Sequence, residues 1–166
     1  MRIDQFQFVD FVETLELSDP AISVRTRIPD NHSIFDGHFP GHPLMPGVLL
    51  TELMAQTCGF LLLSLNGFME MPFLAALKDV KLRNFVGPGA ELLCEAVRVH
   101  DGSGYAVLNA SVRASGQQSR ICNGTLMFRI VPFANDELRQ HMRVRAKEVG
   151  LSLNGKSISL VVKGAS

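Results

Sequence analysis

A histidine and a glutamate stand close together in an unusual stretch of the chain, FDGHFPGHPLMPGVLLTELMAQ, at residues 35–56. His38 lies in a segment rich in glycine and proline, and Glu52 lies in the apolar run that follows. A neutral imidazole accepts a proton near physiological pH, whereas a carboxyl group shielded from water keeps its proton. The pair would therefore suit general acid–base catalysis. The residues alone also allow a solvated Glu52 at a helix entrance and a His38 bonded only to backbone.

The prolines of this stretch predict where a helix begins. They are Pro40, Pro43 and Pro46. Each removes a backbone donor and restricts the residue before it, so we expect residues 36–46 to be non-helical. Pro46 suits the first position of a helix. The N–H groups of Gly47, Val48 and Leu49 would then lack intrahelical partners and offer a site for a carbonyl oxygen that gains negative charge.

Gln56 follows Glu52 by four residues, so both side chains would lie on one face of this helix and could hydrogen-bond. If a sheet covers that face, desolvation raises the pKa of Glu52 and favours its acid form. No metal site is expected from His32, His38 and His42, because the proline and glycine between the last two prevent a helix that would align them.

The composition indicates one soluble globular domain. The chain has 166 residues, of which 46% are hydrophobic and 19% charged, and its net charge is zero, which argues against a nucleic-acid binder. A secretory signal consists of a basic region followed by an apolar region, and the N-terminal segment does not show this pattern. We therefore expect a cytoplasmic protein. The apolar run 48–65 could span a membrane by length, but Glu52 within it favours a buried helix. Cys58, Cys94 and Cys122 follow no metal or redox spacing and are expected to be buried thiols.

Hydrophobic periodicity predicts strands on both sides of this helix. The clearest alternation is in residues 21–28, where Ile22, Val24 and Thr26 point one way. The other expected strands are 8–17, 73–85, 91–99, 105–114 and about 120–131. Two strands, a long helix and then four strands in consecutive hairpins predict an α+β fold, with an antiparallel sheet wrapped around a central helix.

The tail has a different character from the rest of the chain. Asn135 is a plausible cap for a basic helix that extends to about residue 149, and residues 157–162 could form a short strand. The basic residues of this helix are Arg139, Arg143, Arg145 and Lys147. We expect a domain at residues 1–133 and an extension at 134–166 that packs on the same domain.

The stretch around His38 and Glu52 closely resembles the active-site segment of the FabZ-type (3R)-hydroxyacyl-[acyl-carrier-protein] dehydratases. Its pattern, HFPG-x-P-x-MPGV followed by L-x-x-E-x-x-AQ, is long and specific. A weaker resemblance extends from about residue 8 to 133. It implies the hot-dog fold and dehydration of (3R)-hydroxyacyl-acyl-carrier-protein to the trans-2-enoyl product in the biosynthesis of fatty acids or specialised lipid acyl chains. It implies no metal or organic cofactor.

The resemblance also implies a role for each matched residue. His38 falls on the catalytic base and Glu52 on the catalytic acid. Gly47 falls on the glycine whose amide polarises the thioester carbonyl, and Gln56 falls on the glutamine that supports the acid. In this family the histidine and glutamate of one site come from different subunits, which implies at least a homodimer and allows a hexamer.

Further binding positions follow from the same resemblance. The substrate-binding positions are Phe39, Leu44, Val48 and Phe73, the last near the place of a gating tyrosine. Lys81 and Arg83 lie where the family has basic residues near the tunnel mouth, and they would suit an acidic carrier protein. A solvated strand face is the alternative for these two. For the basic tail helix, three alternatives stay open: it docks a carrier protein, it covers the sheet, or it lies in solvent.

Three other functions stay open at this point. A hot-dog acyl thioesterase would release a free thiol without an enoyl product. A hydratase would act on enoyl-coenzyme A esters. A non-catalytic acyl-carrier-binding subunit would bind the carrier tightly and turn nothing over.

Overall fold

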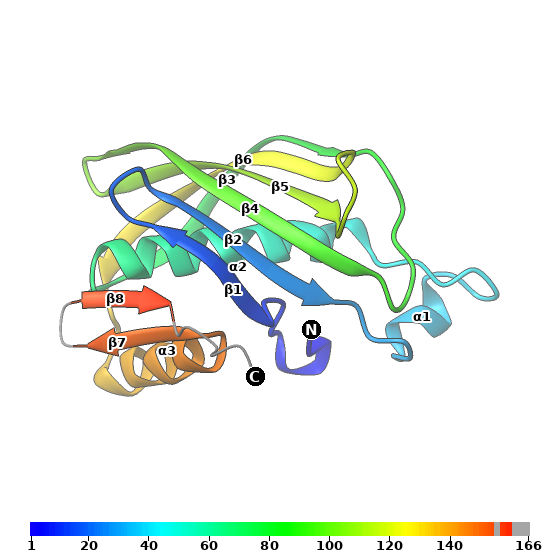
Figure 1. Ribbon diagram of the computed structural model, residues 1–166, viewed down its shortest axis with the longest axis horizontal. Helices are drawn as coiled ribbons and strands as arrows, with labels where there is room; N and C mark the ends of the chain where they lie inside the picture. The colour runs from blue at the N-terminus through cyan, green and yellow to red at the C-terminus, as the bar shows by residue number, and fades with distance from the viewer. Residues whose placement is uncertain (155–156, 161–166) are drawn as a thin grey trace.

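The fold is an antiparallel sheet curved around one long helix (Figure 1). The computed structural model describes residues 1–154 and 157–160. The central helix is α2 (Gly47–Leu65), and it follows the short helices η1 (Ile3–Gln5) and α1 (Ile34–Gly37). The strands of the sheet are β1 (Phe11–Glu16), β2 (Ala21–Arg27), β3 (Glu70–Leu82), β4 (Glu91–Gly102), β5 (Tyr105–Ala114) and β6 (Arg120–Pro132). The tail contains α3 (Asp136–Glu148), β7 (Leu151–Asn154) and β8 (Ser157–Leu160).

The position of β3 differs from the sequence-based expectation. The strand order is β1-β2-β4-β5-β6-β3. The expected hairpins between β4 and β5 and between β5 and β6 are confirmed, but the expected hairpin between β3 and β4 is wrong: β3 pairs with β6, and β4 joins β2. Leu74 lies opposite Phe128, and Leu77 lies opposite Leu126. The physical reason is the connection at residues 83–90, which is too long for a tight hairpin and instead carries the chain to the middle of the sheet. As a result, β3 forms one edge.

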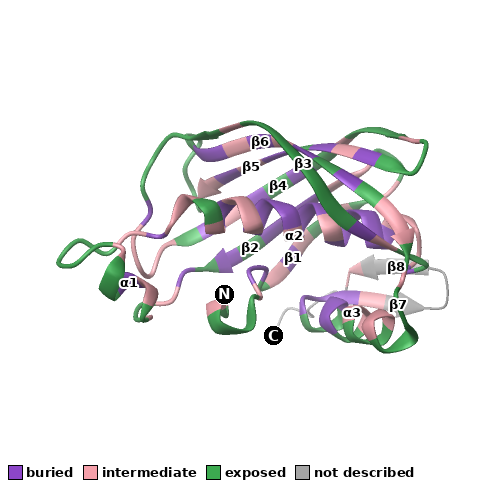
Figure 2. Ribbon diagram, turned by 180° about the vertical axis from the view of Figure 1, so that it is seen from behind, coloured by how far each residue is buried: buried purple, intermediate pink, exposed green. Residues whose placement is uncertain are grey.

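The core lies between α2 and the concave face of the sheet (Figure 2). Leu53 and Leu61 of α2 are fully buried, as are Leu108 and Val112 of β5. Burial on most sides explains why this helix is apolar nearly all round. Within the described residues, α2 is the one helix long and apolar enough to cross a membrane, and most of it is buried, as in the core helix of a soluble protein. The predicted buried helix is confirmed.

The tail packs against the edge of the sheet formed by β1. Its helix α3 begins as predicted, with the Asn135 side chain accepting a hydrogen bond from the Leu138 N–H at 2.8 Å. The Val12 N–H donates to the Val149 carbonyl at 2.8 Å, which ties the end of α3 to β1. β8 falls within the predicted strand 157–162, of which residues 161–162 lie outside the described residues. The two open sheet edges are thereby reduced to one, at β3.

The three cysteines are free and buried in separate elements, as expected. Cys58 lies on α2, Cys94 on β4 and Cys122 on β6. Burial raises the pKa of Cys94 to about 12 and that of Cys122 to about 11. These thiols therefore act as small apolar core residues.

Candidate active site

The loop that carries His38 is held by its own backbone hydrogen bonds. It leaves α1, which includes residues 36–37, so the expected absence of helix is wrong for these two positions. The first proline of the loop comes only at position 40, and its restriction does not reach back to α1. The Leu44 N–H donates to the His38 carbonyl at 2.8 Å, and the Met45 N–H donates to the Val86 carbonyl at 2.7 Å. The loop is thus tied to the connection that follows β3.

The His38 ring has a defined tautomer. Its Nδ1 lies 2.9 Å from the Leu44 carbonyl oxygen. Because a carbonyl oxygen only accepts, Nδ1 carries the proton, and Nε2 of the neutral ring keeps a free lone pair. The ring also stacks on Phe39, with centroids 4.1 Å apart. His38 is therefore arranged as a base that acts through Nε2.

The start of α2 is one residue later than expected. Pro46 is the N-cap and Gly47 the first helical residue. The Leu49 N–H donates to the Pro46 carbonyl at 3.0 Å, so it is not one of the free groups that we expected. The N–H groups of Gly47 and Val48 lie at the positive end of the helix, as we expected. A side chain at Gly47 would meet the end of the Leu82 side chain of β3, which is 54% exposed and would have to shift.

Gln56 connects the Glu52 carboxyl group to the N-terminal segment. Its Nε2 donates to Glu52 Oε1 at 2.9 Å and to the Phe6 carbonyl at 2.8 Å, and its Oε1 accepts from the Phe8 N–H at 2.9 Å. Both ends of the amide are therefore used, and its orientation is fixed because the N–H groups must face the acceptors. The predicted contact between Glu52 and Gln56 is confirmed.

Burial gives the Glu52 carboxyl group the character of an acid. Desolvation raises its pKa above the ordinary value, and the hydrogen bond from Gln56 offsets part of that rise. The amide holds Oε1, so Oε2 is the oxygen available to carry a proton into the cavity beside it. This arrangement suits proton donation to a departing group.

A cavity of about 290 Å³ begins at Glu52 and follows α2. The residues of α2 that line it lie on one face of the helix: Glu52, Ala55, Gln56, Gly59, Phe60 and Leu63. The other walls come from residues 5–7, from β3 at residues 71–74, from Phe128 and from α3. The surface is mostly apolar, with the carboxyl group at one end of the α2 face.

None of the residues that line this cavity belongs to the His38 loop. Phe39 instead faces a separate hollow beside α1. One chain therefore does not bring His38 and Glu52 together in the Glu52 cavity. The His38 ring and the Glu52 carboxyl group therefore lie at different surfaces of the chain.

The other predicted binding residues divide between the two surfaces. Phe73 lies on β3, is half exposed and lines the Glu52 cavity. Phe39 and Val48 are exposed, at 50% and 73%, and with Leu44 they lie on the His38 side without lining that cavity. Of the four, Phe73 is the one that a single chain brings to the acid.

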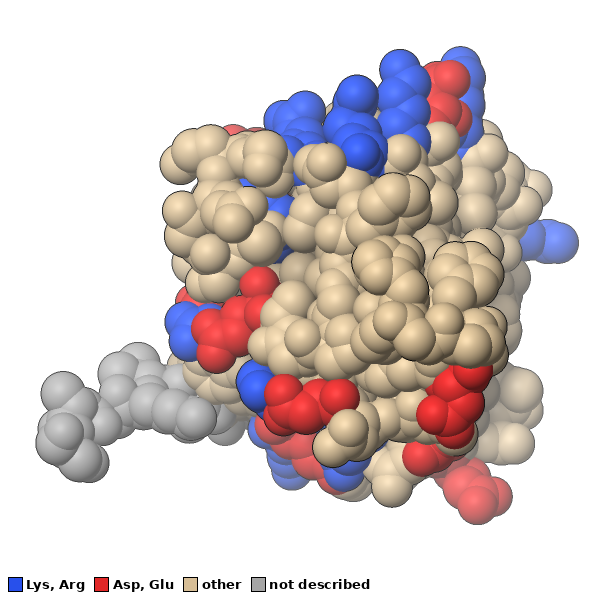
Figure 3. All heavy atoms as spheres, turned by 90° about the vertical axis from the view of Figure 1, so that its right-hand side faces the viewer, with Lys and Arg blue, Asp and Glu red and all other residues tan. Residues whose placement is uncertain are grey.

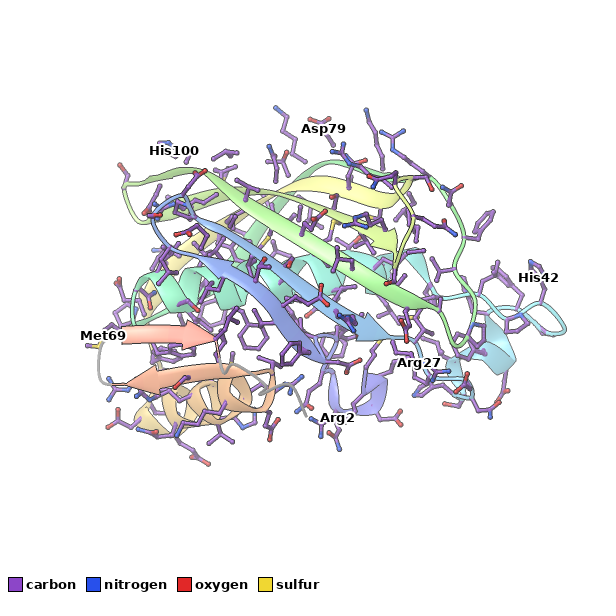
Figure 4. The ribbon with its side chains drawn as sticks, in the orientation of Figure 1. Arg2, Arg27, His42, Met69, Asp79 and His100 are labelled. Carbon is purple, nitrogen blue, oxygen red and sulfur yellow. The ribbon has the colours of Figure 1, made fainter. Side chains whose placement is uncertain are left out.

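Lys81 and Arg83 lie at the end of β3, and both are exposed. Arg83 Nε donates to Asn123 Oδ1 at 3.1 Å, and no described residue forms an ion pair with either cation. Lys and Arg side chains gather along the upper edge of the molecule in Figure 3, and Asp79 of β3 lies at the same edge in Figure 4. The cations are therefore free to meet an acidic partner.

Most residues that line the cavity were not predicted from the sequence, and they include a buried polar group and residues of the tail helix. Gln7 has a buried Oε1 that no described residue hydrogen-bonds, and Met142 and Arg145 come from the tail helix. Arg145 looks like part of a basic surface in the sequence, yet only 8% of it is exposed. No local signal reveals this, because buried arginines are rare and depend on distant partners. Among the described residues, no group of three or more His, Cys, Asp or Glu side chains could hold a metal ion.

The architecture defines the class of protein as a hot-dog fold. A hypothetical thioesterase from Streptococcus pneumoniae, solved with coenzyme A, superimposes with a TM-score of 0.59 at 15% identity, covering 76% of this chain and 91% of that one. A conserved protein from Pseudomonas aeruginosa gives a TM-score of 0.56 at 22% identity, covering 73% of this chain and 87% of the other. At these identities the likeness concerns the fold alone.

Sequence comparison identifies the family. The model of the FabA-like domain matches residues 2–125. The 3-hydroxyacyl-[acyl-carrier-protein] dehydratase FabZ of Streptococcus mutans is 38% identical over 117 residues, which cover 70% of this chain and 82% of the relative. FabZ of Levilactobacillus brevis is 35% identical over 134 residues, with 79% and 86% covered. The chain belongs to the FabA-like family, in its FabZ-type dehydratase branch.

Proposed function

We propose that this protein dehydrates (3R)-hydroxyacyl groups held on an acyl carrier protein and forms trans-2-enoyl thioesters for the biosynthesis of fatty acids or related lipid acyl chains. The observation that carries the proposal is the Glu52 carboxyl group, whose pKa is raised by burial and whose orientation is fixed by Gln56 at an apolar cavity. The relatives of this chain, which are named as 3-hydroxyacyl-[acyl-carrier-protein] dehydratases, supply the substrate class.

The proposed chemistry is an elimination between neighbouring carbons. His38 Nε2 takes the hydrogen α to the thioester, while the N–H of Gly47 stabilises the carbonyl oxygen as it gains negative charge. The C–H electrons form the new double bond, and the β-hydroxyl leaves as water with the proton from Glu52. His38 then returns its proton through solvent, which restores the acid. Positioned acid–base groups of this kind contribute roughly 10² to 10⁴ in rate.

The active unit in this proposal is a homodimer, because the Glu52 cavity contains no residue of the His38 loop. The sheet edge at β3 supports a second copy as the partner. Phe73, Leu74 and Leu77 on this strand are 50%, 40% and 47% exposed, and an apolar edge strand invites pairing with another strand.

Antiparallel pairing of two β3 edges would complete the site. Phe73, near the start of β3, lines the Glu52 cavity, and Leu82, at its end, lies over Gly47 beside the His38 loop. In an antiparallel pair related by twofold symmetry, the end of one β3 faces the start of the other. The His38 loop of one subunit would therefore approach the Glu52 cavity of its partner.

The carrier protein would dock at the basic end of β3. Lys81 and Arg83 are exposed cations near the start of α2, where the thioester would be held. Acyl carrier proteins present their substrate on a phosphopantetheine arm, and its phosphate and an acidic carrier surface suit these side chains. The free buried thiols fit a reducing compartment, so we include a cytoplasmic location in the proposal.

Subunit complementation tests both the residues and the shared site. The variants His38→Ala and Glu52→Gln should each be inactive as pure proteins, when assayed for enoyl product from 3-hydroxyacyl-acyl-carrier-protein. Mixed at equal amounts and allowed to exchange subunits, they should regain about a quarter of the wild-type activity, since half of the dimers are mixed and each has one intact site.

The outcomes of this experiment separate the alternatives. Enoyl product from the wild type with no recovery in the mixture would place both residues in one subunit and overturn the shared site. Release of free thiol without enoyl product would make the protein a thioesterase. Faster turnover of coenzyme A esters than of carrier-bound substrates would favour a hydratase, and carrier binding without turnover would favour a binding subunit.

A further inference from the structure

The tail helix α3 forms a wall of the Glu52 cavity, although it lies outside the region that the family shares. His141, Met142 and Arg145 line the cavity, and their spacing places them on one side of the helix. The family match ends at residue 125, and α3 begins at Asp136. This wall is therefore an addition to the common fold.

Buried contacts fix the position of this wall. The Arg145 guanidinium donates to the Val9 carbonyl and to Glu148 Oε2, the latter at 3.1 Å. Ala146 of α3 and Val149, the C-cap residue of this helix, are fully buried. Because α3 is anchored by a buried cation and by packed apolar groups, it acts as a rigid boundary of the cavity.

The cavity is elongated, and α3 lies toward its end away from the start of α2. Its α2 face extends from Glu52 to Leu63, which corresponds to about 16 Å at 1.5 Å per residue. Figure 1 shows α3 beneath the half of α2 that ends at Leu65. An acyl chain that follows this face of α2 therefore reaches the α3 wall.

We propose that α3 sets the upper limit of acyl chain length and that Met142 is the residue that decides it. This inference rests on the proposed function, since it takes the Glu52 cavity as the place of the acyl chain. Met142 is the apolar member of the wall and is partly buried against the core, whereas Arg145 is held by its own partners and His141 is exposed. A change in the size of the Met142 side chain therefore changes the depth of the cavity directly.

A binding measurement tests this limit without relying on turnover. The probes are saturated acyl-pantetheine amides in an even series from butanoyl to hexadecanoyl, whose affinities are measured by calorimetry on the full-length protein. For the wild type, we expect affinity to rise with chain length up to the length that reaches the α3 wall and then to fall.

Three variants test whether the size of the Met142 side chain sets the limit: one enlarges the cavity, one reduces it and one is the control. Met142→Ala should move the limit to longer chains. The affinity for the shortest probe that exceeds the wild-type limit should rise by roughly tenfold or more, which is the range in which a pocket discriminates one methylene. Met142→Phe should move the limit to shorter chains. Val144→Ala, on the same helix with a side chain 56% exposed and away from the cavity, should leave the limit unchanged.

The same variants in the turnover assay separate this inference from the proposed function. If the chain-length limit stays in place in both Met142 variants while the wild type forms enoyl product, the role of α3 is wrong and the dehydratase proposal stands. If the limit moves in the binding series but no chain length is turned over, the acyl cavity stands and the dehydratase proposal fails.

Discussion

At the scale of single residues, Gln56 controls the protonation of Glu52. Its amide N–H stabilises the carboxylate and so lowers a pKa that burial raises. In Gln56→Met this donor is lost, the neutral acid is favoured, and the pKa of Glu52 rises further. The limb of the pH–rate profile that reports Glu52 should therefore move to higher pH, while kcat falls because the carboxyl group is less well positioned. The measurement is kcat/KM across pH.

Asn66→Ala provides the control for the Gln56 variant. Asn66 lies at the opposite end of α2 and donates to the Glu70 carbonyl at 2.9 Å, so its loss perturbs the helix without touching the acid. Its profile should keep the wild-type limbs. An unchanged Glu52 limb in Gln56→Met would contradict the role that we assign to this amide.

At the scale of elements, Gly150 fixes the junction between α3 and β7. Its φ is +95°, and an added Cβ would lie 2.6 Å from Phe11 Cε2 of β1. Gly150→Ala should therefore lower the free energy of unfolding by about 2 kcal/mol or more, from backbone strain and overpacking together. Urea denaturation monitored by circular dichroism measures this loss.

A second glycine separates the two contributions. Gly116 has a φ of +75° in an open turn, and no atom lies within 4 Å of an added Cβ. Gly116→Ala therefore introduces backbone strain without overpacking and should lower the free energy of unfolding by about 1 kcal/mol. Equal losses in the two variants would mean that the tail does not pack on β1 tightly enough to hold α3 in place.

The sequence predicts the parts of this architecture that depend on residues close together in the chain, and it fails for those that depend on distant residues. The contact of Glu52 with Gln56 follows from helix spacing, and the cap at Asn135 follows from local chemistry, so both were predicted correctly. The pairing of β3 with β6 depends on which strand edges are free after the whole sheet forms, and the hairpin prediction failed there. The burial of Arg145 depends on the Val9 carbonyl, far away in sequence, and carries no local signal.

At the scale of the whole molecule, one edge of the sheet is covered and the other is exposed. The tail covers the edge at β1, while β3 exposes apolar side chains along the other edge. Leu77→Lys places a charge in the middle of β3 and should convert the proposed dimer to monomers, because edge lysines oppose strand pairing. Enoyl-forming activity should fall at least tenfold, since each site would lose its partner loop. Sedimentation equilibrium and the turnover assay measure the two effects.

Val144→Lys serves as the control for an added charge, because Val144 is 56% exposed on α3 and neither belongs to β3 nor lines the Glu52 cavity. It should leave both the oligomeric state and the activity as in the wild type. A Leu77→Lys protein that remains dimeric and fully active would show that β3 is not the subunit interface.

The three buried thiols give this molecule an internal reporter of opening. Cys58, Cys94 and Cys122 lie on the helix and on two different strands, and none is exposed. A thiol reagent can reach them only when helix and sheet separate, so the labelling rate counts opening events rather than surface chemistry. The buried groups also keep protons that the unfolded chain releases above about pH 8.5, so the free energy of unfolding falls as the pH rises beyond that value. Mild alkali therefore loosens the core on which the Glu52 cavity is built, and the labelling of the thiols measures that loosening.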